Sequence, residues 1–128
     1  VNIGVDITRN TVINGFTIKL AKGGYNAGIY SLGTPTISNN RILGHEEADT
    51  GPLCWYQMGI VFYNSTSTPS ALVQYNIIDP KWSSTTDNIT YGIYIQDSEP
   101  EINLNYMISG GSGVTGSYTY GIYIIGEY

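Results

Sequence analysis

The sequence contains few charged residues and almost no cysteine. Charged residues make up 12% of the 128 residues, and Cys54 is the single cysteine. About 25% charge is typical of a soluble globular domain. A lone cysteine forms no internal disulfide and no second cysteine supports a metal site, so we interpret Cys54 as a small buried hydrophobe or a loop thiol.

Basic residues are scarcer than acidic ones. Five Lys and Arg stand against ten Asp and Glu, which gives a formal net charge of −5, and the basic residues do not cluster. A face that binds nucleic acid needs concentrated positive charge against the phosphates, so nucleic acid is excluded as a partner. A polyanionic polysaccharide is also disfavoured unless metal ions bridge the like charges.

Long hydrophobic runs and helical patterns are missing as well. No stretch approaches the roughly 18 consecutive apolar residues that indicate a membrane span, and no signal-peptide pattern opens the sequence. Glycine, asparagine, aromatic and β-branched residues interrupt every stretch that could form a long helix. The sequence therefore predicts an all-β chain with no membrane span.

The sequence does contain a repeat. The tetrapeptide that begins at Gly28 returns in similar form at Gly59, Gly92 and Gly121, at spacings of 31, 33 and 29 residues. A further copy is expected at Gly4-Val5-Asp6-Ile7. Internal periodicity of this length is typical of proteins that stack one structural unit on the next.

A second signature follows the first in each unit. An apolar residue stands three positions before an asparagine and another stands two positions after it, around Asn40, Asn76 and Asn105 and, more loosely, Asn14. Asparagine tolerates the left-handed backbone conformation of a sharp bend, and stacked asparagine side chains can form a hydrogen-bonded ladder. We expect both properties at these positions.

The two signatures together predict three short strands in each unit. Alternate residues of a strand share a face, so Ile93 and Ile95 should point inward and Tyr94 outward. Such strands bury their apolar rows only when parallel copies stack about 4.8 Å apart. We therefore predict a right-handed parallel β-helix solenoid over 1–128, a single segment of about four coils. Its insertions should lie on one face, at 19–27, 45–58, 80–91 and 110–120.

Two runs carry a resemblance to a known family. GIYIQDSEPEINLNYMISGGSG and GIYSLGTPTISNNRILG resemble the right-handed parallel β-helix repeats of the pectate-lyase-like superfamily. The similarity is to the Ser-x-Pro-x-Ile-x-x-Asn-x-Ile-x-Gly type of bacterial and archaeal surface and secreted proteins, and it extends from Gly4 to Gly126. It implies an extracellular or cell-surface location. It does not imply one activity, because the superfamily includes lyases, hydrolases, tailspikes and adhesins.

The catalytic motifs of the superfamily's enzymes are missing from this sequence. The chain has no Asp-Asp, Gly-His-Gly or Arg-Ile-Lys, and Arg9 and Arg41 fall in the strand repeats without clustered aspartates. The leading expectation is a non-catalytic structural or interaction module, with fibre formation left open. The alternative is a fragment of a carbohydrate-active or glycan-binding β-helix protein.

Two acidic groups are candidates for a metal site or a catalytic site. Glu46, Glu47 and Asp49 are weak candidates for Ca²⁺, which prefers oxygen ligands, although the simpler interpretation is a solvated loop. No other cofactor is expected. Asp97 and Glu99 could meet the carboxyl spacing of a glycosidase, about 5 to 9.5 Å, but we interpret them as a surface turn.

The tyrosines offer the stronger signal. Tyr30, Tyr94 and Tyr123 should occupy one outward position of the first strand, with Asp6 and Val61 at the same position in other units, and further aromatics, including Trp55 and Tyr56, precede the glycines. A flat row of rings could stack on sugars. The same rings could instead pack under loops or against another subunit, and both interpretations stay open.

The remaining candidates concern the surface and the ends. Asn64 and Asn88 begin glycosylation sequons, which matter only in a secreted protein. No capping element is visible at either end of the predicted solenoid, and uncapped coils present strand edges that can pair. The expected partners are therefore flanking coils or other copies of the chain, with a polysaccharide as a further candidate.

Overall fold

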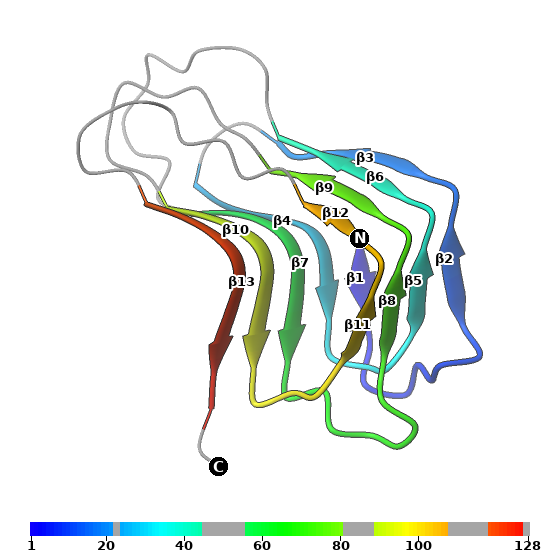
Figure 1. Ribbon diagram of the computed structural model, residues 1–128. Coiled ribbons are helices and arrows are strands. Elements are labelled where there is room, and N and C mark those ends of the chain that lie inside the picture. Colours follow the sequence, from blue (N-terminus) through cyan, green and yellow to red (C-terminus); the bar gives the residue numbers. More distant parts are fainter. Residues whose placement is uncertain (22–23, 45–55, 81–88, 108–117, 127–128) are drawn as a thin grey trace.

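The computed structural model describes residues 1–21, 24–44, 56–80, 89–107 and 118–126. These ranges contain thirteen β-strands and no helix, arranged in three sheets (Figure 1). Sheet A consists of β1 (Asn2–Ile3), β4 (Tyr25–Ser31), β7 (Tyr56–Tyr63), β10 (Ile89–Gln96) and β13 (Tyr118–Ile125). Sheet B consists of β2 (Val12–Asn14), β5 (Thr36–Ser38), β8 (Leu72–Gln74) and β11 (Glu101–Asn103). Sheet C consists of β3 (Thr17–Lys19), β6 (Arg41–Leu43), β9 (Ile77–Asp79) and β12 (Tyr106–Met107).

The chain visits the three sheets in a fixed order. It passes from sheet A to B to C and then returns to sheet A one strand further along, and every pair of neighbouring strands is parallel. We call one such round a coil; the four coils begin at β1, β4, β7 and β10, and β13 starts another round. The prediction of an all-β chain with three strands per coil is confirmed, and the arrangement is compatible with a parallel β-helix.

The longest connections all run from sheet C to the next strand of sheet A. Leu43 ends β6 and Tyr56 begins β7, and the connections from β9 to β10 and from β12 to β13 have the same place in the topology. The insertions predicted at 45–58, 80–91 and 110–120 fall at these points, but the last residues of each, like those of the insertion predicted at 19–27, belong to the following sheet A strand. Residues 45–55, 81–88 and 108–117 themselves lie outside the described residues.

The strands of sheet A are longer than the repeat predicted. Each complete strand begins three residues before its glycine, as in β10, where Ile89 precedes Gly92. Strict alternation fails at this glycine. Thr90 and Ile93 are three residues apart, so regular alternation would place them on opposite faces, yet both are buried. The sheet A strands therefore bend near their glycines, and Figure 1 shows this curvature in β4, β7, β10 and β13.

The first coil is offset from its predicted position. Asn2 pairs with Tyr30 and Ile3 with Ser31, so the first copy of the strand is β1 (Asn2–Ile3) and the assignment to Gly4-Val5-Asp6-Ile7 is wrong. Asp6 accordingly does not share the outward position of Tyr30. Single glycines and apolar residues are common in this sequence, so one four-residue match could not fix the register.

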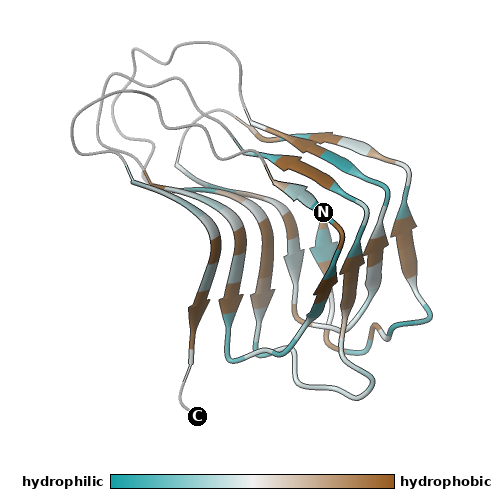
Figure 2. Ribbon diagram, viewed as in Figure 1, coloured by the Kyte–Doolittle hydropathy of each residue, from teal (hydrophilic) through white to brown (hydrophobic). Residues whose placement is uncertain are grey.

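The core is a set of stacked apolar rows. Ile29, Ile60 and Ile93 are consecutive partners in sheet A and are all fully buried. Sheet B contributes the buried pair Ile37 and Val73, and sheet C contributes Ile42 and Ile78. Figure 2 shows the hydrophobic residues concentrated in the middle of the sheet B strands and the lower halves of the sheet A strands. The predicted stacking of equivalent isoleucines is confirmed.

An asparagine ladder joins the coils where sheet B turns into sheet C. Asn76 Oδ1 accepts the Asn40 backbone N–H at 2.9 Å, and Asn105 Oδ1 accepts the Asn76 N–H at 3.0 Å. The Nδ2 groups of Asn76 and Asn105 donate to carbonyls of the preceding coil, at Ile37 and Val73, both at 2.9 Å. Each asparagine thus clamps the coil before its own, as the predicted ladder requires.

Two details of the asparagine prediction need correction. The left-handed residue is the one before the ladder asparagine, with φ of 53° at Asn39, 57° at Tyr75 and 50° at Leu104. In the first coil the ladder position belongs to Phe16, not Asn14, since the Phe16 N–H donates to Asn40 Oδ1 at 3.0 Å. The bend is therefore made by the preceding residue, while the asparagine supplies the clamp.

The repeated glycines mark the closest approach between coils. A Cβ atom on Gly59 would lie 2.5 Å from the Gly92 carbonyl oxygen of the next coil and 2.4 Å from Ile78 Cγ2. A Cβ atom on Gly92 would lie 2.4 Å from the Gly121 carbonyl oxygen. Glycine recurs because any side chain would force neighbouring coils apart.

Candidate functional site on the outer face of sheet A

Tyrosines line the outer face of sheet A. The strand register pairs Tyr25 with Tyr56, Tyr91 with Tyr120, and Tyr94 with Tyr123. Tyr30 shares the outward position of Tyr94 and Tyr123, as predicted, with Val61 between them. We call the contacting set the tyrosine row. It consists of Tyr25, Tyr56, Tyr91, Tyr94, Tyr120 and Tyr123.

The rings of the row stack along the direction in which the coils stack. Ring centroids lie 4.9 Å apart for Tyr25 and Tyr56, 6.1 Å for Tyr56 and Tyr91, and 5.4 Å for Tyr91 and Tyr120, with interplanar angles of 19° or less. A parallel stack joins Tyr94 to Tyr123 at 5.6 Å. Tyr94 meets Tyr91 edge to face at 5.3 Å. These distances are in the range where aromatic pairs attract.

The stacking bears on both interpretations of the tyrosines. A ring face that lies against another tyrosine is not free to stack on a sugar, so the contacts within the row favour packing. The row also borders a shallow hollow of about 390 Å³, lined by Tyr25, Tyr56, Met58, Tyr91, Tyr94 and Tyr123. The hollow could receive a ligand, so sugar binding by Tyr30, Tyr56, Tyr94 and Tyr123 stays a prediction.

Tyr91 and Tyr120 are central to the row, and the sequence predicted them as part of the aromatic group before the glycines, in the insertions and not in the strands. They lie within the strands, because each strand begins upstream of its glycine. The signal was present as an aromatic residue directly before the glycine in Tyr91-Gly92 and Tyr120-Gly121. Strict alternation would have placed both on the inward face, with Ile93 and Ile122, and they face outward because the alternation breaks at the glycine.

Tyr91 has the largest pKa shift in the row. Its side chain is 6% exposed, and burial, followed by the charge that ionised Tyr56 and Tyr123 would carry, raises its pKa from 10.0 to about 12. Burial also raises the pKa of Tyr94, whose hydroxyl donates to Gln96 Oε1 at 3.1 Å. The surroundings of Tyr91 and Tyr94 thus favour the neutral form of these two phenols.

This perturbation predicts how stability depends on alkaline pH. Because the folded state raises the pKa of Tyr91, its stabilising effect is complete below pH 10 and is lost as the pH rises through about 12. We expect the free energy of unfolding to fall across this window, and to fall less in Tyr91→Phe, which has no proton to lose. Denaturant titrations at a series of pH values measure the slope.

Tyr106→Phe, on sheet C and 65% exposed, is the matched control. It should follow the parent chain across the whole pH range. An equal alkaline slope in the parent chain and in Tyr91→Phe would show that the stack does not couple Tyr91 ionisation to folding.

A second hollow, of about 290 Å³, lies beside the turns that leave sheet A. Its lining includes Ser65, Asp97, Ser98 and Glu99. The groups here have structural partners: Ser98 Oγ accepts the Ser65 N–H and donates to the Gln96 carbonyl, both at 2.8 Å. No group of three or more potential metal-ligating side chains occurs among the residues that the structure describes. The turn interpretation of Asp97 and Glu99 is compatible with this geometry.

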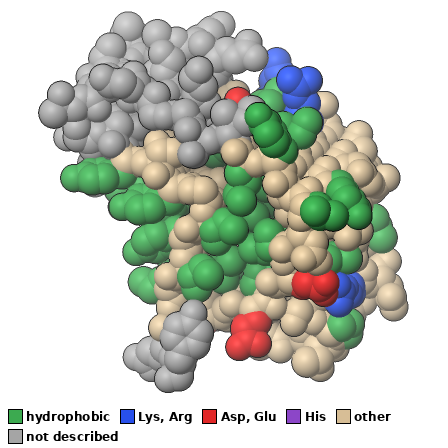
Figure 3. Space-filling view, in the orientation of Figure 1, with side chains coloured by type: hydrophobic (Ala, Val, Ile, Leu, Met, Phe, Trp, Pro, Cys, Tyr) green, Lys and Arg blue, Asp and Glu red, His purple; other side chains and the backbone are tan. Residues whose placement is uncertain are grey.

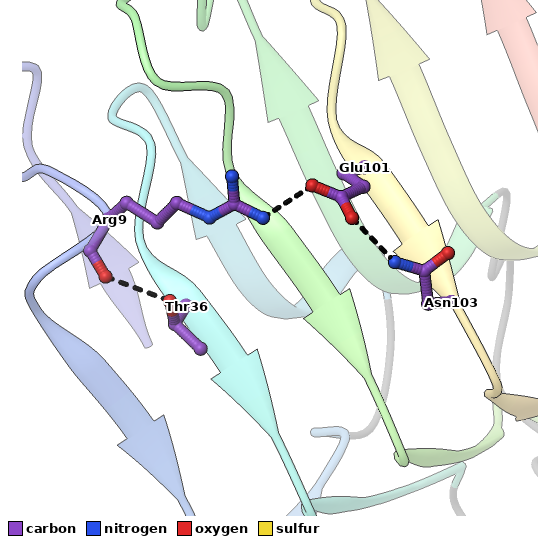
Figure 4. Close-up of polar contacts among 4 residues, drawn as sticks. All are labelled: Arg9, Thr36, Glu101 and Asn103. Atoms are coloured by element: carbon purple, nitrogen blue, oxygen red, sulfur yellow. Dashed lines mark hydrogen bonds and ion pairs between the residues drawn. The ribbon is translucent and has the colours of Figure 1, made fainter.

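An ion pair crosses the outer face of sheet B (Figure 4). Arg9 lies in the connection from β1 to β2, outside any strand, and its Nη2 donates to Glu101 Oε2 at 2.5 Å. The Arg9 hydrogen bond, followed by one from Asn103, lowers the pKa of Glu101. Thr36 Oγ1 donates to the Arg9 carbonyl at 2.8 Å. The pair links the first coil to the fourth, and its exposure limits its effect on stability.

The other predicted candidates divide between the surface and the residues that the structure does not describe. Asn64 lies in an exposed turn with φ of 50°, next to the buried Ser65, whose hydroxyl donates to the Gly33 carbonyl at 2.5 Å. Its glycosylation stays a prediction. The remaining candidates fall outside the described residues. They are Glu46, Glu47, Asp49, Trp55 and Asn88.

Within the described ranges there is no helix that could cross a membrane. Comparison of the chain with protein-family models, with curated proteins and with solved structures finds no match. The geometry of the coils and of the tyrosine row is therefore the basis for any functional proposal.

Proposed function

We propose that the chain is a non-catalytic structural module, a right-handed parallel β-helix segment of an extracellular or cell-surface protein. The order of the sheets and the repeat that resembles surface and secreted β-helix proteins support this proposal. Right-handed connections between parallel strands are also the strong rule in proteins. The module would act as a stiff rod that presents its tyrosine row on the outer face of sheet A.

The observation that carries the proposal is the hydrogen bonding of two buried asparagines and two buried serines. Asn40 and Asn76 are 2% and 1% exposed, and their side chains hydrogen-bond to neighbouring coils. Ser31 and Ser65 both donate to the Gly33 carbonyl. Polar groups engaged in this way hold the coils in register and do not converge on a place where a substrate could react.

A glycan-binding module is the second candidate, and the hollow beside the tyrosine row favours it. Tyr94 and Tyr123 border this hollow and lie near the C-terminal end of the row. Aromatic rings beside an open hollow are a common setting for sugar contacts. The net charge of −5 favours a neutral polysaccharide over an acidic one.

Titration with neutral and acidic polysaccharides, together with an assay for newly released reducing ends, separates the two candidates. The structural role predicts neither cleavage nor saturable binding. Saturable binding that weakens at least about tenfold in Tyr94→Ala and in Tyr123→Ala, a loss of about 1.4 kcal/mol, but not in Tyr106→Ala, would replace the structural role with glycan binding. Circular dichroism of each variant shows whether the fold is retained.

A further inference from the structure

The C-terminal face of the stack, formed by β11, β12 and β13, leaves core positions uncovered. Ile122 and Ile124 are 40% and 56% exposed, whereas their partners in β10, Ile93 and Ile95, are 0% and 3% exposed. Figure 3 shows hydrophobic side chains gathered in the middle of this face. This face has the same kind of residues as the interfaces between coils in the interior, but no further coil covers it in the described structure.

Gly121 keeps a feature that only a further coil would require. Cβ atoms on Gly28, Gly59 and Gly92 would each lie within 2.8 Å of the next glycine's carbonyl oxygen, whereas a Cβ atom on Gly121 would meet nothing within 4 Å. No contact in the described structure thus demands glycine at this position. A strand stacked on β13 would place a carbonyl where that Cβ would be.

The asparagine ladder is also open at this end. Asn40 and Asn76 each donate their backbone N–H to the asparagine of the following coil. Asn105 is the last asparagine of the ladder among the described residues. A following coil with asparagine in register would supply the acceptor that the Asn105 N–H needs once it is covered.

We propose that the C-terminal face binds one further parallel coil of the same repeat, with asparagine over Asn105 and glycine over Gly121. Its strands follow the order sheet B, sheet C, sheet A. The end of β13 keeps the register of β10, because the Asp97 N–H donates to the Ile125 carbonyl as the Asn64 N–H does to the Gln96 carbonyl. The inference rests on the proposed role as a structural module and names the partner of that module.

A second copy of this chain is a poorer occupant than such a coil. Its first coil carries Phe16 at the ladder position, and a phenylalanine side chain offers no acceptor to the Asn105 N–H. In such a stack, β13 of one copy and β1 of the next would both have to pair with the same β4. Within one chain, β1 already pairs with β4 at Tyr30 and Ser31. End-to-end stacking would displace β1 and leave a buried donor unpaired.

The test is a chain extended by one coil. A copy of residues 97–125 follows Ile125, which places the copied asparagine over Asn105 and the copied glycine over Gly121. We expect thermal unfolding to shift upward by at least about 5 °C and amide exchange of Ile122 and Ile124 to slow at least about tenfold. The matched control has phenylalanine in place of the appended asparagine and should lose most of the shift.

Gly121→Val is the second arm of the test. In the original chain it should leave the unfolding temperature nearly unchanged, because the site is open. In the extended chain it should abolish the upward shift. An extension that changes neither unfolding nor exchange, or a shift that survives Gly121→Val, would overturn the proposal, as would end-to-end polymers of the original chain in sedimentation velocity. The polysaccharide titration tests the structural role separately, so the two failures can be told apart.

Discussion

Gly59→Ala is expected to lower the free energy of unfolding by about 3 kcal/mol, the upper part of the range for overpacked interiors. The added methyl group would lie 2.5 Å from the Gly92 carbonyl oxygen and 2.4 Å from Ile78 Cγ2. The side chain of Ile78 could rotate, but the carbonyl belongs to the backbone of the next coil. It can move only if β7 and β10 separate, and the two strands pair on both sides of these glycines, Met58 with Tyr91 and Ile60 with Ile93. Urea-induced unfolding measures the loss.

Gly121→Ala is the matched control for Gly59→Ala. It places the same substitution in the same Gly-Ile sequence, yet the new methyl group meets nothing within 4 Å. We expect a change within about 0.5 kcal/mol, as for a surface substitution. If both variants lost the same stability, the cost would come from the backbone preference of glycine and not from the contact between coils.

The sequence was sufficient for the periodic part of the fold. Glycines and asparagines at a spacing of about 30 residues located the sheet A strands and the turn from sheet B to sheet C, and alternation predicted that Ile60 and Ile93 would stack. These features repeat in the second, third and fourth coils, so each copy supports the others. The same repetition predicted where the long connections would fall.

The sequence did not predict the features that occur in one coil alone. The register of the first coil depended on one copy, and the chance match at Gly4 misplaced it by several residues. The ion pair from Arg9 to Glu101 joins residues 92 positions apart, and no periodic pattern predicts it. The sequence does not predict that Tyr56, Tyr91 and Tyr120 stack on one another, because this contact depends on the register between strands.

The asparagine ladder provides the second large effect. Asn76→Leu keeps the branched shape of the side chain and its number of heavy atoms but removes its hydrogen bonds. It leaves the Asn40 N–H and the Ile37 carbonyl, which bond to Asn76 in the parent chain at 2.9 Å each, without partners in the interior. An unsatisfied buried polar group costs about 1–3 kcal/mol, so the free energy of unfolding should fall by about 4 kcal/mol.

Asn103→Leu separates this loss from the general cost of replacing asparagine. Asn103 is exposed in β11, and its Nδ2 donates to Glu101 Oε1 at 2.8 Å on the surface, where water can replace the bond. We expect a change within about 0.5 kcal/mol. Amide hydrogen exchange adds a local measurement, because the Asn40 N–H should exchange much faster in Asn76→Leu and at the parent rate in Asn103→Leu. Unchanged protection of Asn40 would mean that water or a backbone shift satisfies the buried donor, and that stacked apolar rows alone keep the coils in register.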